Sequence, residues 1–244
     1  MRQYILAALA AMSLLASAQT KDYGYPITPV PFTSVKVTGD FWSQRLKASR
    51  DVTIPLAFSK CEETGRYDNF VKAAHPSDTN KVPGYPFDDT DVYKTIEGAA
   101  YSIQTFPNKK LEHYIDSVIV LMGKAQEADG YLYTARTLNP KHPHEWSGTQ
   151  RFEKVEDLSY EFYNLGHMIE GAVAYYQATG KRAYLDIAIR YADCVDRAIG
   201  DGPNQVVRVP GHQIAEMALC KLYLVTGEKR YLNLAKFFLD KRGK

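Results

Sequence analysis

The strongest constraint on this chain is a stretch of sequence that occurs twice. The positions that recur at a spacing of 47 residues are Thr179-Gly180, Tyr184-Leu185 and Ala188 in the first copy, and Thr226-Gly227, Tyr231-Leu232 and Ala235 in the second. In each copy a helical segment ends at Thr-Gly and a second helical segment follows. A repeat of this length that contains two helices predicts stacked helical hairpins.

The two helices of each copy differ in their hydrophobic pattern. From Phe162 to Tyr176 both helix faces are largely uncharged, which predicts a helix that is covered on two sides. From Tyr184 to Val195 one apolar stripe lies opposite charged residues, which predicts a helix with one face in water. Ile214 to Val225 and Tyr231 to Phe238 repeat the difference. The chain is therefore expected to alternate inner and outer helices.

The remaining sequence supports an all-helical fold. Asp91 to Ala128 has the pattern of another hairpin, and Phe41 to Cys61 that of a first helix interrupted near Pro55. Strand patterns are nearly absent apart from Thr33 to Val37. The predicted fold class is all-α: an incomplete (α/α)6 toroid built of inner and outer helical hairpins, preceded by a short extended arm. An open solenoid is the alternative arrangement of such hairpins.

The N-terminus has the pattern of an export signal. Arg2 precedes an apolar run from Tyr4 to Leu15, which is too short to span a bilayer, and Ala16-Ser17-Ala18 is an A-x-A site. We expect a signal peptide over residues 1–18, cleavage after Ala18 and a secreted or periplasmic protein. Residues 19–40 are then the extended arm, and residues 41–244 the helical domain.

Composition narrows the classes of function. A net charge of +2 gives no electrostatic case for nucleic-acid binding. Cys61, Cys194 and Cys220 have no zinc-site or disulfide spacing and are expected to be small buried thiols. Tyrosine is abundant, with 18 residues, which suits a sugar-binding cleft, although from composition alone half-burial on amphipathic helices is the favoured explanation.

Two histidines are the best candidates for ligand contacts. His167 and His212 lie 45 residues apart, and each follows a glycine near the start of an inner helix. Stacked repeats would bring both to one end of the ring, where they and Tyr163 could contact a sugar; packing at a helix start is the alternative role. Glu170 and Glu216 follow them at three and four residues, a spacing that differs from that of H-E-x-x-H zinc sites.

Three carboxylates precede or begin the helix near residue 90. Glycoside hydrolysis often uses two carboxyl groups, so Asp88, Asp89 and Asp91 are candidates. Aspartate before an apolar helix is also a common N-cap, which we expect for Asp88 and Asp89. Asp91, in the first turn, remains a candidate for substrate binding. His142 and His144 are expected on a surface loop.

These motifs together resemble a known family. The segments that carry the resemblance are "GYPFDDTDVYKTIEGAAYSI", "DGYLYT", "YEFYNLGHMIEGAVAYYQATGKRAYLDIAIRYAD" and "GHQIAEMALCKLYLVTGEKRYLNLAKFFLD". They are similar to glycoside hydrolase family 127, the β-L-arabinofuranosidase-type group. The resemblance implies an (α/α)6 barrel followed by β-sandwich domains in longer proteins, and retaining hydrolysis of a terminal β-L-arabinofuranosyl unit from plant-type oligo- or polysaccharides. His167 and His212 match family histidines that contact the sugar.

The resemblance also implies zinc. The family's nucleophile is a zinc-bound cysteine and its acid/base a glutamate, in a Glu-x-Cys segment and a Cys-Cys pair that this chain lacks. We therefore assign substrate binding to His167, His212, Asp91 and Tyr163, and assign no catalytic residue and no metal ligand. The chain is expected to be the N-terminal portion of such an enzyme, inactive alone. The alternatives are another (α/α)6 sugar enzyme, such as an epimerase or an unsaturated-uronyl hydrolase, or a non-catalytic helical-repeat binding module.

Overall fold

The computed structural model describes residues 27–243. The chain divides into two compact units, and the boundary in the sequence follows Val35. Within its described part, the first unit has one short element, the 3-10 turn η1 (Phe32–Ser34), closed by a hydrogen bond from Ser34 N to Pro31 O. The strand predicted at 33–37 is wrong, because none of the described residues pairs with this backbone as a neighbouring strand. The predicted signal peptide lies outside the described residues.

The second unit is built of helices. Over residues 36–243 we find no strand, only an isolated bridge between Ile199 and Val206, so the all-α prediction is confirmed. None of the described helices has the length and apolar character needed to cross a bilayer. The elements are α2 (Asp40–Ala48), the π-helical turn η2 (Ser49–Thr53), α3 (Ile54–Glu63), α4 (Arg66–Ala73), α5 (Asp89–Thr105), α6 (Lys109–Ala125), α7 (Thr134–Thr137), the 3-10 turn η3 (Glu145–Ser147), α8 (Glu161–Thr179), α9 (Ala183–Ala198), α10 (Ala215–Thr226) and α11 (Lys229–Lys241).

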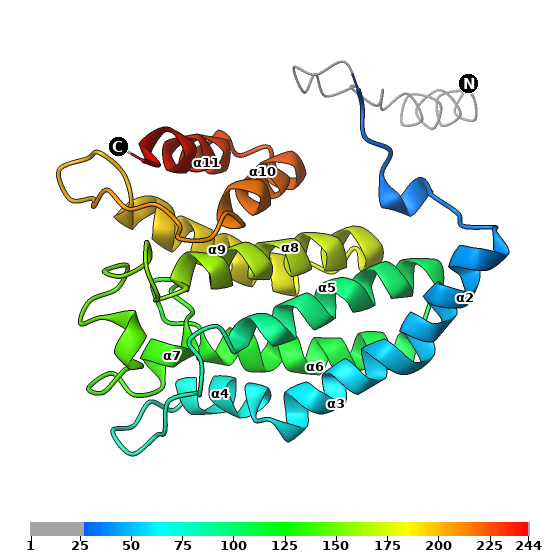
Figure 1. The fold of residues 1–244 in the computed structure, drawn as a ribbon, viewed down its shortest axis with the longest axis horizontal. Coiled ribbons are helices and arrows are strands. Elements are labelled where there is room, and N and C mark those ends of the chain that lie inside the picture. The colour runs from blue at the N-terminus through cyan, green and yellow to red at the C-terminus, as the bar shows by residue number, and fades with distance from the viewer. Residues whose placement is uncertain (1–26, 244) are drawn as a thin grey trace, which may run out of the picture. The chain divides into compact units, whose positions relative to one another are not determined.

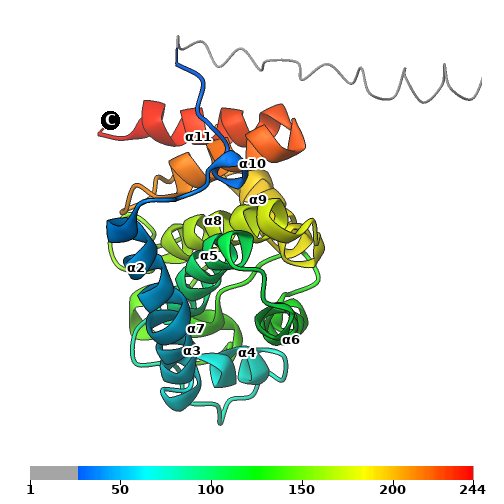
Figure 2. The ribbon, with the colours of Figure 1, turned by 90° about the vertical axis from the view of Figure 1, so that its right-hand side faces the viewer.

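The helices after α4 stack as hairpins in chain order, which is visible in two perpendicular views (Figures 1 and 2). In one layer α8 packs against both α5 and α10. In the other layer α9 contacts both α6 and α11. The predicted alternation of inner and outer helices is therefore confirmed, with α5, α8 and α10 as the inner helices.

The first helix is irregular where the sequence predicts an interruption. The π-helical turn η2 separates α2 from α3 and ends two residues before Pro55, which occupies the first turn of α3. Proline has no amide hydrogen and its ring crowds the carbonyl four residues earlier, so the backbone widens before it.

The two Thr-Gly motifs end α8 and α10 with the same chemistry. Gly180 and Gly227 are left-handed, with φ of 75° and 78°. Thr179 Oγ1 donates to a carbonyl four residues earlier at 2.6 Å and accepts from Lys181 N at 3.2 Å. Thr226 Oγ1 makes the matching bonds at 2.8 and 3.2 Å. A left-handed glycine and a threonine hydroxyl thus end both inner helices.

The glycine of each Gly-His pair allows close packing. A Cβ atom on Gly166 would lie 2.7 Å from Ile214 Cγ2 and 3.0 Å from the backbone nitrogen of Ala215, so α8 can approach the start of α10 only without a side chain there. A Cβ atom on Gly211 would lie 2.8 Å from the carbonyl oxygen of Glu156. The repeated Gly-His dipeptide therefore reflects packing at its glycine.

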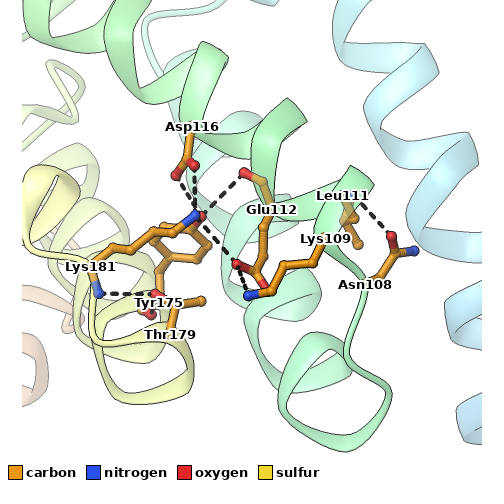
Figure 3. A network of polar contacts seen from close by, with 8 residues as sticks. All are labelled: Asn108, Lys109, Leu111, Glu112, Asp116, Tyr175, Thr179 and Lys181. Carbon is orange, nitrogen blue, oxygen red and sulfur yellow. Dashed lines mark hydrogen bonds and ion pairs between the residues drawn. The ribbon is translucent and has the colours of Figure 1, made fainter.

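A polar network joins the end of α8 to the start of α6 (Figure 3). Lys181 Nζ lies 2.6 Å from Asp116 Oδ2, and Tyr175 donates to the same carboxylate at 2.7 Å. Lys109 and Lys181 both contact Glu112, and although burial opposes ionisation, their hydrogen bonds lower the pKa of this carboxyl group. The network lies at the end of α8 away from His167, and we interpret it as structural.

The core accounts for many of the tyrosines. Those that are fully buried are Tyr93, Tyr131, Tyr133, Tyr175, Tyr184, Tyr191 and Tyr231. These tyrosines serve packing, and they are more deeply buried than the half-burial expected from the sequence. The tyrosines that remain partly exposed include those near the two histidines.

Candidate functional site

The predicted sugar-binding residues of α8 and α10 form one cluster of rings. The ring centroids of Tyr163 and His167 lie 4.5 Å apart, and those of Tyr163 and His212 lie 5.2 Å apart. Tyr160 completes the cluster, 5.7 Å from Tyr163 and 5.1 Å from His212. The two histidines therefore lie at the same end of the inner layer, on either side of Tyr163, as the stacking argument predicts.

Helix geometry explains half of the cluster and loop geometry the other half. Tyr163 and His167 are four residues apart on α8, so they lie on one helix face. His212 lies in a bend three residues before α10, rather than in the helix itself. The position 47 residues after His167 is Ile214, so the two histidines are not strict repeat mates. The fold brings them together in spite of a two-residue offset.

Lys94 of α5 joins this cluster, although the sequence analysis did not identify it. Its Nζ atom donates to Tyr163 Oη at 3.1 Å and lies 5.1 Å from the centroid of the Tyr163 ring. Three residues separate it from Asp91, so both lie on one face of α5. The spacing to Asp91 was the available signal in the sequence, but the contact of Lys94 with Tyr163 depends on how α5 and α8 pack.

His167 is neutral at physiological pH. Burial, and secondarily the positive charge of Lys94, lower the pKa of His167 to about 4. Its Nδ1 atom is buried and has no hydrogen-bond partner within residues 27–243. A neutral imidazole both donates and accepts, which suits sugar hydroxyl groups. An unpaired buried nitrogen is costly in free energy, and a bound sugar hydroxyl would remove that cost.

The glutamates that follow the histidines have other partners. Glu170, which is buried, pairs with Lys221 of α10. Glu216 Oε1 lies 2.8 Å from Arg242. Both carboxylates thus bind cations of neighbouring segments, and these ion pairs hold the hairpins together.

The aspartates before and within α5 divide into two roles. Arg66 binds Asp91 Oδ2 at 3.1 Å and Asp88 Oδ1 at 3.2 Å. Asp89 accepts from Thr134 N at 2.9 Å and from Thr134 Oγ1 at 2.6 Å, and burial raises its pKa to about 7. The predicted N-cap role of Asp88 and Asp89 is wrong: Asp88 makes no capping bond, and Asp89 holds the loop that begins α7.

Asp91 lies in the first turn of α5, one helical turn before Lys94. Its side chain is part-exposed and is held by Arg66, and it shares the α5 face with Lys94. The role of Asp91 in substrate binding stays a prediction, because its contacts within the protein are compatible with such a role but do not test it.

The predicted surface position of His144 is wrong. It is buried rather than exposed, and its Nδ1 accepts from Trp146 N at 3.2 Å while the two rings meet edge to face at 5.4 Å. His144 therefore shapes the turn η3. Buried loop histidines of this kind carry no periodic signal in the sequence, which is why a surface position was expected.

The cysteines do not form a thiolate site. Cys61 of α3, Cys194 of α9 and Cys220 of α10 are all free. Burial raises the pKa of each thiol, to about 11 for Cys194, which disfavours the ionised form that zinc binds. Within residues 27–243 no three His, Cys, Asp or Glu side chains come together in a way that could hold a metal ion. The described residues thus do not fit a zinc site by themselves.

A cavity of about 740 Å³ lies away from the histidines, among the C-terminal ends of α4 and α6 and the loop after α7. Its arginines are already engaged: Arg151 pairs with Glu127 and Asp129, and Arg136 donates to the carbonyl groups of residues 147–150. The ring cluster, with its unpaired imidazole nitrogen, is the better candidate for ligand binding.

Comparison with known proteins supports the family resemblance that the motifs carry. The family model for the GH127 catalytic domain, β-L-arabinofuranosidase, matches residues 34–244. A non-reducing end β-L-arabinofuranosidase of Bifidobacterium longum subsp. longum is 34% identical over 232 residues, which cover 86% of this chain and 34% of that protein.

Solved structures resemble the chain as well. A GH127 β-arabinofuranosidase is 76% identical with a TM-score of 0.88, covering 90% of this chain and 35% of that one. A GH127 β-L-arabinofuranosidase from Geobacillus stearothermophilus T6 is 38% identical with a TM-score of 0.79, covering 86% and 33%. The chain spans about a third of the length of these relatives. The identities show similarity in sequence, and the TM-scores show that the fold of this chain is similar to that of the matched part of these enzymes.

Proposed function

The chain belongs to glycoside hydrolase family 127, and on that basis we propose that it binds the terminal β-L-arabinofuranosyl unit of a plant-type oligo- or polysaccharide. The observation that carries the proposal is the ring cluster in which His167 and Tyr163 of α8 meet His212 of the bend before α10. A neutral His167 offers a donor and an acceptor without the desolvation cost of a charge.

The charged residues beside the cluster would orient the sugar. Lys94, held at the Tyr163 hydroxyl, and Asp91, held by Arg66, lie on the same face of α5. A cationic donor and an anionic acceptor at fixed positions can both bind vicinal hydroxyl groups. In this proposal the histidines and Tyr163 contact the ring of the sugar, and Lys94 and Asp91 contact its hydroxyls.

Bond cleavage requires groups that we do not assign to this chain. We propose that it supplies the sugar-binding part of a secreted retaining β-L-arabinofuranosidase and that the zinc thiolate and the acid/base belong to other parts of a longer enzyme. The high thiol pKa values of the three cysteines support this division. Export is supported by the A-x-A site at residues 16–18, and a mature N-terminus at Gln19 in mass spectrometry of exported protein would test it.

Calorimetric titration of the purified chain with methyl β-L-arabinofuranoside tests sugar binding. We expect His167→Ala and His212→Ala each to weaken binding by about 10-fold or more, the equivalent of one hydrogen bond to a ligand. His75→Ala, an exposed histidine outside the cluster, is the matched control and should leave the Kd unchanged. Equal affinities for all four proteins would overturn the assignment of the site.

Hydrolysis of an aryl β-L-arabinofuranoside tests the second part of the proposal. The purified chain should release no aryl alcohol with or without added zinc. Zinc-dependent turnover that a chelator abolishes would show that the chain carries the catalytic groups itself, and would overturn the proposed division.

A further inference from the structure

A run of aromatic rings leads from the histidine cluster to the solvent. The Tyr160 and Phe87 rings meet edge to face at 5.0 Å, and Phe87 stacks on Tyr85 with centroids 5.1 Å apart and planes inclined by 15°. The side chain of Tyr85 is 53% exposed. Rings therefore follow one another without a gap from the half-buried His167 to an open aromatic face at Tyr85.

The loop that carries this face is tied to the inner helices. Thr90 donates to the Phe87 carbonyl through its backbone nitrogen at 2.9 Å and its hydroxyl at 2.8 Å. The side-chain amide of Asn164, which is fully buried, donates to Pro86 O at 3.2 Å and to Tyr160 O at 2.9 Å. One amide of α8 thus fixes both sides of the contact between Tyr160 and Phe87. The aromatic platform formed by Tyr85, Phe87 and Tyr160 is therefore preorganised.

Tyr160 has a backbone that needs this support. It is the residue before α8 and is left-handed, with φ of 61° and ψ of 14°, a conformation that is unfavourable for a residue with a side chain. The next residue, Glu161, is buried and accepts bonds from Tyr131 Oη at 2.6 Å and Ser159 Oγ at 2.8 Å. These bonds hold the conformation that places the Tyr160 ring between Phe87 and His212. Backbone strain of this kind is concentrated at functional sites.

The platform residues are uncharged, and the charged residue next to them in the sequence is neutralised by an ion pair. Tyr85, Phe87 and Tyr160 carry no charge, and the neighbouring Asp88 is paired with Arg66. An exposed, uncharged aromatic ring such as that of Tyr85 binds a neutral sugar ring through its apolar face, while the tyrosine hydroxyl bonds to polar groups. The position is continuous with the site proposed for the terminal sugar, and it lies on the solvent side of that site.

We propose that Tyr85, Phe87 and Tyr160 form an outer subsite that binds the second sugar unit of the glycan, on the reducing side of the terminal arabinofuranosyl unit, by stacking. The proposal rests on the proposed function, because it needs the terminal sugar at the histidines. The chain would then bind the leaving-group sugar as well as the terminal one.

Calorimetry with two ligands tests the outer subsite. Methyl β-L-arabinofuranoside reaches the histidines alone, and a disaccharide with a terminal β-L-arabinofuranosyl unit reaches both sites. We expect the chain to bind the disaccharide about 5- to 10-fold more tightly, the gain typical of one stacked ring. Tyr85→Ala should remove most of that gain and leave the affinity for the methyl glycoside unchanged, whereas Tyr85→Phe, which keeps the ring, should retain it.

The outcomes separate the two proposals. If the unaltered chain binds neither ligand, the proposed function is overturned and the outer subsite with it. If the chain binds both ligands equally, or if Tyr85→Ala keeps the preference for the disaccharide, the outer subsite alone is overturned. Because Tyr85 is exposed, its replacement should not unfold the protein, and thermal melts followed by circular dichroism verify this.

Discussion

Two hairpins of this molecule share a sequence pattern but differ in their surroundings. The hairpin of α8 and α9 lies between α5 and α6 on one side and α10 and α11 on the other. The hairpin of α10 and α11 packs on α8 and α9. Positions 47 residues apart can therefore be compared as the same local structure in two environments.

The comparison separates local structure from burial. The Thr-Gly ends of the two inner helices make the same bonds with nearly the same φ. Leu185 is fully buried, whereas its mate Leu232 is 39% exposed; Ala192 is fully buried, whereas Leu239 is 59% exposed. Helix ends thus follow from sequence within one turn, and burial follows from what packs on the helix.

The largest expected effect comes from truncating the paired leucines. Leu185→Ala removes a fully buried side chain and should lower the free energy of unfolding by about 2–5 kcal/mol, whereas Leu232→Ala should cost about 1 kcal/mol or less. Urea denaturation followed by circular dichroism measures both. Equal losses would mean that the exposed leucine is covered in solution and that the two environments do not differ.

Next in size is a pH effect confined to the first hairpin. His167 has Ile214 at its repeat position, so only α8 carries a titrating group there. Its pKa, about 4 in the folded chain, lies below the unfolded value, so the unfolded state binds more protons between these values. The contribution of His167 to stability should therefore rise by about 2 kcal/mol from pH 4 to 6.5 and level off above. Asp89, whose pKa burial raises to about 7, acts in the opposite direction over this range, so the His167 contribution is measured as a difference between two proteins.

Two variants test the assignment of this pH effect. Denaturation curves of His167→Asn over the same pH range should lack this contribution, so the stability difference between the unaltered chain and the variant should grow by about 2 kcal/mol from pH 4 to 6.5. Lys94→Met removes the smaller of the two causes of the low pKa, and most of the rise should remain. An unchanged slope in His167→Asn would assign the effect to another group.

The glycines at the two helix ends should respond alike. A Cβ atom on Gly180 or Gly227 would meet no atom within 4 Å, so only the left-handed backbone opposes a side chain. Each alanine replacement should cost about 1–2 kcal/mol, with the two costs equal within error. Gly98→Ala, in the middle of α5 with open space around it, is the control and should stabilise by about 0.5–1 kcal/mol. Unequal costs in thermal melts would contradict a purely local cause.

The smallest expected effect is at the threonines. Thr179→Val and Thr226→Val remove a hydroxyl that donates to one backbone group and accepts from another, and each should cost about 0.5–1 kcal/mol. Thr→Ser at either position keeps the hydroxyl and should restore most of the loss. A larger loss at Thr179 would indicate that its cap also supports the network of Figure 3.

The candidate site shows where prediction from the sequence stops. His167 and Tyr163 were identifiable because a spacing of four residues places them on one helix face. Lys94 and Tyr160 were missed because their positions depend on how α5 meets α8 and on a left-handed residue before α8. Asp88 and Asp89 were assigned to capping by residue type, and the fold gives them Arg66 and Thr134 as partners from elsewhere in the chain.

The sequence by itself determined the two hairpins of the 47-residue repeat, their Thr-Gly helix ends and their inner and outer faces, because all of these depend on residues within a few turns of one another. It did not indicate the short helices α4 and α7. Only the tertiary structure decided which rings meet. His212 lies outside its helix and two residues out of repeat register with His167, yet both contact Tyr163. That meeting depends on Gly166 letting α8 approach the start of α10, a contact between segments distant in sequence that no local pattern records.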